Sequence, residues 1–128
     1  MEIEEALYSR LSTDAPLIAE VADRIYPVEA KQGTTNPFLV FTRLYTQGNA
    51  TMNLASGLYA SRFTFEAWAK DATKARDVAT KIRSCLDGFS GTIMTVRIWG
   101  IIFVDRYQTY EADSRLFSDV IDLRIFHN

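Results

Sequence analysis

Only one cysteine and one histidine are available for nucleophilic chemistry, Cys85 and His127. A thiol beside an imidazole can act as a covalent catalyst, because the imidazole accepts the thiol proton. Cys85 falls on the apolar stripe of a predicted helix, however, where a free cysteine packs as a small hydrophobic residue and is unreactive. His127 is the penultimate residue, and this position predicts a frayed strand end rather than a catalytic base.

Carboxylates form two close pairs along the sequence, Glu111 with Asp113 and Asp119 with Asp122. Charged neighbours of both signs surround the first pair, which favours a solvated or ion-paired loop. The second pair cannot act together from one strand, because residues three apart point to opposite faces. Neither pair has the spacing of a calcium-binding loop, and segment 88–91 lacks the lysine of a phosphate-binding loop. We therefore predict no catalytic residue, no cofactor and no metal site.

Length and composition predict one globular domain over residues 1–128. Apolar residues make up 48% of the 128 residues and charged residues 23%, as in ordinary folded proteins. The formal net charge of −2 argues against a protein that binds duplex nucleic acid. The longest dense apolar stretch, 98–104, is far shorter than the roughly 18 residues of a membrane span. An acidic N-terminus does not resemble a signal peptide, and a single cysteine excludes a disulfide framework or zinc finger.

Helical periodicity predicts three helices in the sequence. Apolar residues recur at intervals of three and four over 3–11. A second helix is predicted to begin at Asp14, a favourable N-cap, with an apolar stripe that ends at Ile25. The third helix covers 72–86, with Asp71 as its N-cap.

The remaining segments read as strands, predicted at 38–45, 58–70, 93–110 and 116–126. Segment 93–110 is long enough for two strands or one bent strand, and Gly100 marks the expected kink or bulge. The order of elements predicts an α+β fold, mainly an antiparallel sheet with helices packed on one face. Between these elements lie two loops, 28–36 and 48–57, which contain too little apolar surface to order themselves without a partner.

The hydrophobic core is predicted from the inward phases of the best strands and the best helix. These residues are Phe63, Phe65, Val78, Ile82, Leu86, Ile121, Leu123 and Ile125.

Two features point to protein contacts. The first is arginine, which supplies ten of the 14 basic residues and suits fixed ion pairs and interfaces, although a salt-rich surface explains it equally well. The second is segment 98–104, which is apolar in both phases. Such a strand is either central in its sheet or covered by a partner, because an exposed edge of this composition would aggregate.

Three blocks of the sequence resemble the tail completion proteins of long-tailed phages and prophages, also called tail terminator or head-to-tail joining proteins. The first runs from DAPLI at 14–18 through DRIYP at 23–27 to PFLVF at 37–41. The second joins RF at 62–63, EAWA at 66–69 and the helix that ends in LDGFSG at 86–91. The third joins YEAD at 110–113, LF at 116–117 and DLRI at 122–125. The chain departs from the family pattern in lacking a proline near 30–32 and in its more apolar strand at 101–104.

The resemblance implies a structural subunit of a ring, generally a homohexamer, at the head-proximal end of a tail tube. Such a ring halts polymerisation of the tube and provides the docking surface for the head connector. The implied partners are other copies of the chain, the tail tube protein and the connector or stopper protein, with no sequence-specific nucleic acid and no membrane. The implied location is the neck of the virion, and the host cytoplasm during assembly.

Two other functions remain open: a small non-enzymatic binding adaptor that acts as a monomer or dimer, and a hydrolase that uses Cys85. If a ring forms, we expect neighbouring subunits to meet through the apolar strand and the charged hairpin tip at 105–115. A closed ring needs two different matching patches on each subunit. The alternative is that the strand is central in the sheet and the tip points into solvent. The residues expected at the interface are Ile98, Ile102, Val104, Arg106, Tyr107, Tyr110 and Arg115.

Overall fold

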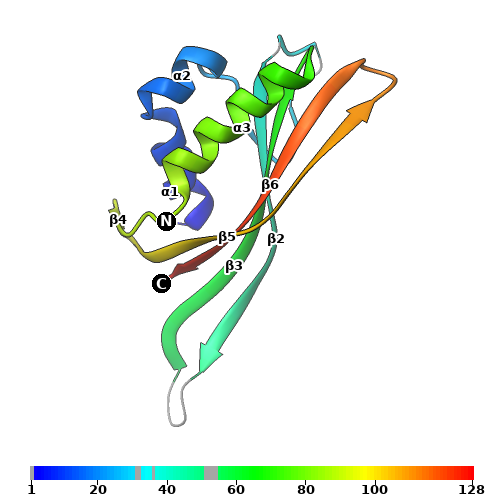
Figure 1. Ribbon diagram of the computed structural model, residues 1–128. Helices are drawn as coiled ribbons and strands as arrows, with labels where there is room; N and C mark the ends of the chain where they lie inside the picture. Colours follow the sequence, from blue (N-terminus) through cyan, green and yellow to red (C-terminus); the bar gives the residue numbers. More distant parts are fainter. Residues whose placement is uncertain (1, 31–32, 36, 51–54) are drawn as a thin grey trace.

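Three helices lie against one face of a six-stranded sheet in the computed structural model (Figure 1). The structure describes residues 2–30, 33–35, 37–50 and 55–128, and it leaves out the side chains of 49, 50 and 55–57. The opposite face of the sheet carries no helix (Figure 1). We call the two sides the helix face and the open face. This arrangement confirms the predicted α+β class and the placement of the helices on one side.

The helices are α1 (Ile3–Ser12), α2 (Ala15–Val21) and α3 (Ala72–Leu86). Their caps are the predicted ones: the Asp14 carboxylate accepts from the Leu17 amide at 3.2 Å, and Asp71 accepts from the Lys74 amide at 2.7 Å.

The prediction that the second helix reaches Ile25 is wrong. Helix α2 ends at Val21, because Ala22 adopts a left-handed backbone with φ of 54°. Ile25 instead begins a short strand, β1 (Ile25–Pro27). Ile25 is buried, as its place in the apolar pattern predicts, but it is buried as part of the sheet and not of the helix.

The other strands are β2 (Phe38–Ala50), β3 (Ala55–Ala69), β4 (Gly91–Ile93), β5 (Val96–Glu111) and β6 (Leu116–His127). Their order across the sheet is β1-β2-β3-β6-β5-β4. Strands β1 and β2 are parallel, and the other neighbours are antiparallel. Of segment 93–110, only Ile93 belongs to β4, and residues 96–110 form one continuous strand with bulges, close to the predicted alternative of one bent strand. The bulge expected at Gly100 is present as a register shift, and a second shift follows between Phe103 and Asp105.

Segment 48–57 is mostly strand, contrary to the predicted loop. The ladder between β2 and β3 continues through Gly48–Tyr59 and Asn49–Leu58, and residues 51–54 lie outside the described part. This end of the hairpin extends beyond all three helices (Figure 1). Small polar residues suit a strand that has no core to cover, so their polarity does not indicate a loop. Of the other predicted loop, residues 31, 32 and 36 are not described.

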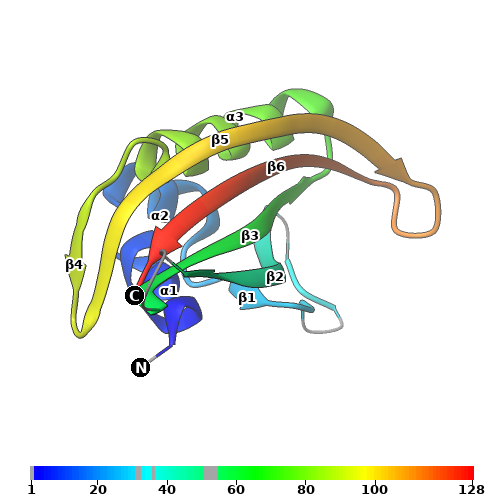
Figure 2. The same cartoon turned by 90° about the horizontal axis from the view of Figure 1, so that it is seen from below.

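The core lies between the helix face and the three helices. It contains all eight residues predicted from periodicity, each completely buried. At the opposite end from the β2–β3 turn, β5 and β6 continue past the end of α3, and Figure 2 shows them curving as one ribbon. Both long hairpins therefore project beyond the helix-covered core.

Candidate interaction surface

The open side of β5 carries a row of large apolar side chains that the described residues leave about half exposed. These side chains are Trp99, Ile102, Val104 and Tyr107, each between 40% and 52% exposed. We call this row the β5 strip. Contiguous exposed apolar surface of this kind marks interaction sites in soluble proteins. The strip includes three residues that the sequence placed at an interface and one, Trp99, that it did not.

Two bulges decide which residues of β5 reach this surface. Strict alternation would put Ile98, Ile102, Val104 and Arg106 on one face. The first register shift moves Ile102 and Val104 to the face opposite Ile98, and the second returns Arg106 to the helix face. Ile98 is completely buried in the core. It supports the strip from behind and is not exposed on it.

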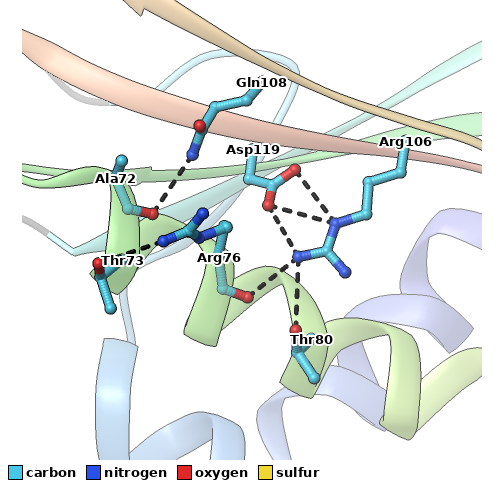
Figure 3. Close-up of polar contacts among 7 residues, drawn as sticks. All are labelled: Ala72, Thr73, Arg76, Thr80, Arg106, Gln108 and Asp119. Carbon is cyan, nitrogen blue, oxygen red and sulfur yellow. Dashed lines mark hydrogen bonds and ion pairs between the residues drawn. The ribbon is translucent and has the colours of Figure 1, made fainter.

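Arg106 is engaged inside its own subunit (Figure 3). Its Nε lies 3.2 Å and its Nη2 2.8 Å from the Asp119 carboxylate, a fork that fits guanidinium geometry. The Nη2 also donates to the Arg76 carbonyl at 3.2 Å and to the Thr80 hydroxyl at 3.4 Å. A neighbouring strand residue, Gln108, donates to the carbonyl at the start of α3.

This cluster, which we call the Arg106 clamp, joins β5 and β6 to α3. The Asp119 side chain is almost completely buried, so its charge requires this partner. The sequence placed Arg106 among the residues expected at an interface between subunits. The structure shows that it positions the hairpin within the subunit.

The remaining predicted residues lie toward the end of the hairpin. Tyr110 lies on the helix face beyond α3 and packs against Phe117, with ring centroids 4.8 Å apart. Arg115 is exposed in the turn, where its φ of 58° is left-handed. Neither residue is brought against the β5 strip within one subunit.

One polar cluster has the geometry of a hydrolytic dyad. The Ser61 hydroxyl lies 2.6 Å from Nε2 of His127, and Nδ1 of His127 donates to the Asn128 carbonyl at 2.9 Å. Both side chains are buried on the helix face, so no substrate reaches the hydroxyl. Burial is the main cause that lowers the pKa of His127 below its usual value. The prediction of a frayed end at His127 is therefore wrong: the imidazole is a neutral structural link between β3 and β6.

Cys85 lies in the core as predicted. Burial raises the pKa of its thiol to about 11, which keeps it protonated and unreactive. Within the described residues, no group of three or more His, Cys, Asp or Glu side chains is placed to hold a metal ion. No described helix is long and apolar enough to span a membrane.

Comparison with known proteins identifies a family and solved structures of similar fold. The family model described as tail completion protein gp17 matches residues 5–128. A solved chain from a structure described as the virion of a native gene transfer agent particle superposes with a TM-score of 0.83. That chain is 16% identical, and the match covers 98% of this chain and 93% of the other, so it shows a shared fold. A search of curated proteins finds no match. Because the family model spans nearly the whole sequence, this chain belongs to the tail completion protein gp17 family.

Proposed function

We propose that this chain forms a ring at the head-proximal end of a phage-type tail, stops the growth of the tail tube and provides the docking surface for the head connector. The observation that carries this proposal is the family match over residues 5–128, which supports a structural role in a phage tail. The fold comparison with a virion chain is consistent with that role. The proposed location is the virion neck, with assembly in the host cytoplasm.

A ring imposes a requirement that the described surface can meet. Each subunit must present two different patches, because a heterologous interface joins one patch to another on the next copy. The β5 strip supplies an apolar centre, and the tip with Tyr110 and Arg115 supplies a polar rim. Tyr107 is the anchor in this scheme, because tyrosine buries a large area and keeps a polar group. Ile98 and Arg106 hold the strip in place from inside the subunit.

Electron microscopy of the purified protein, alone and mixed with tail tubes, tests the proposal. We expect rings, and we expect tubes that carry one ring at a single end. Sedimentation across a range of concentrations should show a species larger than a dimer. A protein that stays monomeric or dimeric alone and in the presence of tubes would instead support the adaptor function.

A matched pair of variants separates the interface from the fold. Tyr107→Ala removes a half-exposed side chain from the strip, and Tyr8→Ala removes a similarly exposed tyrosine from α1. We expect ring formation to weaken at least about tenfold in the first variant, as at an anchor position, and to be unchanged in the second. Equal assembly of both variants would remove the strip from the interface.

A further inference from the structure

A pocket of about 390 Å³ lies on the open face, between the β5–β6 tip and the connection from β1 to β2. Three carboxylates line it, from Glu29, Glu66 and Glu111, and none of the described lining residues is basic. The carboxylates come from three separate parts of the chain: the β1–β2 connection, β3 and the end of β5. The fold therefore creates a concave site with strong negative charge in a protein of nearly neutral net charge.

Aromatic rings form one wall of this pocket. Phe38 and Trp68 are stacked, with centroids 6.3 Å apart and planes 16° from parallel. The Trp68 indole nitrogen donates to the Glu66 carboxylate at 3.2 Å, which fixes the ring and the acid relative to each other. A flat ring beside a carboxylate is the surface on which a guanidinium group stacks and forms ion pairs.

Two polar groups on this face lack a particular kind of partner among the described residues. Glu66 forms no ion pair with a described residue, and burial followed by the charge of Glu111 raises its pKa. Ser118 pairs in register with Trp68, so its hydroxyl points to the same face. That hydroxyl is completely buried and has no hydrogen-bond partner among the described residues. Glu66 therefore lacks a cation, and the Ser118 hydroxyl lacks a hydrogen-bond partner, among the described residues, although buried polar groups are normally satisfied.

We propose that this pocket receives an arginine of a neighbouring copy of the chain, and that the arginine is Arg124. This inference rests on the proposed ring, and it adds the chemistry of one contact in it. The guanidinium stacks on Trp68 and pairs with Glu66 and Glu111. The pocket is one patch of the heterologous interface, and the surface around Arg124 is the other.

Several features single out Arg124. It is exposed on the open face, lies over the Phe126 ring with its guanidinium carbon 5.2 Å from the centroid, and forms no ion pair with a described residue. It lies directly opposite Arg62 in the ladder, and like charges in that position repel. Its other neighbour in register is Ile102 of the β5 strip. An arginine among apolar side chains has the composition of an interface hot spot.

Arg124 cannot occupy the pocket of its own subunit. Strand β6 rises about 14 Å from Val120, the partner of Glu66 in register, to Arg124. From Leu116, which lines the pocket, the rise is about 27 Å. If Arg124 completes the site, it must therefore come from another molecule.

The chemistry of the pocket is testable without any ring. The full-length chain carrying Trp99→Phe leaves Trp68 as its one indole, whose NMR resonance reports on the pocket. N-acetylarginine amide should shift this resonance in a saturable way, whereas the neutral isostere N-acetylcitrulline amide should not. Glu66→Gln together with Glu111→Gln should abolish the shift. Equal shifts with both compounds, or no shift with either, would overturn the pocket assignment.

A charge exchange tests the occupant. Glu111→Arg and Arg124→Glu each change an exposed side chain, so the fold should be retained. Each alone should weaken ring assembly at least about tenfold by sedimentation, and the two together should restore it in part. Arg76→Glu, which changes an exposed arginine on α3, is the matched control and should assemble normally.

Rings in the wild type without restoration in the double variant would overturn the pairing with Arg124 while the proposed function stands. Absence of rings in the wild type would overturn the proposed function. The NMR experiment would then decide separately whether the pocket binds a guanidinium group.

Discussion

The two faces of the sheet use apolar side chains in different ways. On the helix face, residues such as Phe63, Phe65 and Ile121 are completely buried under the helices. On the open face, the β5 strip has side chains of similar size that remain about half exposed. Both sets consist of large apolar side chains on strands, so residue type alone does not distinguish them. The difference teaches that a core and a contact surface differ in what covers them rather than in composition.

Polar groups show the same contrast. On the helix face, Asp119 is held by the fork of Arg106, which reaches further groups on α3. On the open face, Asp122 pairs with Arg62 through a single 3.0 Å contact. That pair leaves the Asp122 Oδ1 and Arg62 Nε atoms buried without partners among the described residues. Among the described residues, three of the four buried side-chain atoms without a hydrogen-bond partner belong to the open face, from Arg62, Ser118 and Asp122, and the fourth is Glu4 Oε1 on α1.

The largest expected difference between the faces is in stability. Phe65→Ala should lower the free energy of unfolding by about 3–5 kcal/mol, because it opens a cavity under the helices. Ile102→Ala on the open face should lower it by less than about 0.5 kcal/mol. Urea unfolding measures both. Comparable losses would show that the open face is also part of the core.

The Arg106 clamp should give the next largest effect. Arg106→Ala leaves the buried Asp119 carboxylate without its cation, and we expect a loss of about 1–3 kcal/mol in unfolding free energy. Arg115→Ala, at an exposed turn position, is the control and should change little. A loss as small as that of the control would mean that the clamp contributes orientation and no stability.

Acid should weaken the helix face through His127. Its pKa is lowered in the folded state by burial, so the unfolded state binds more protons below about pH 6.5, the usual value. Stability should therefore fall as the pH drops through that region. His127→Gln should remove this part of the pH dependence, as measured by thermal unfolding at a series of pH values. A wild-type profile identical to that of the variant would contradict the assignment.

The smallest effect is expected on the open face, where acid should raise the stability of the fold rather than lower it. The raised pKa of Glu66 means that the folded state holds its proton more tightly than the unfolded state does. Its charge therefore weakens the fold as the pH rises above about 4.5, and protonation on acidification restores that stability. Glu66→Gln should flatten this part of the profile. If the variant instead loses stability at neutral pH, the carboxylate has a favourable partner within the subunit.

Much of the helix face was predictable from the sequence. The stripe in 72–86, the caps at Asp14 and Asp71, and the eight core residues all follow from spacing and residue type. Strand β1 was missed, because three residues are too few for a periodic signal. Trp99 was missed at the surface although it belongs to the same apolar segment as Ile102.

The β5 strip depended on information that alternation does not contain. Two bulges move Ile98 and Arg106 to one side of the sheet and Ile102 and Val104 to the other. The first bulge was expected from Gly100, which has no side chain to pack in a strand. The second bulge contains no glycine, so the sequence gives no signal for it. Each register shift reverses the face of the sheet to which every later residue points. One bulge that the sequence does not signal is therefore enough to assign Arg106 to the wrong face.

Local sequence was enough to predict where the helices begin, their caps, the fold class and the inner core, because periodicity and capping depend on neighbours a few residues apart. Tertiary structure decided which polar groups meet: Ser61 with His127, Arg106 with Asp119, and the three acids that line the open-face pocket. Such partners are set by register across the sheet and by the curvature of its strands. Register is a long-range property of the assembled ladder, so residues far apart in the chain acquire their roles only when the sheet forms.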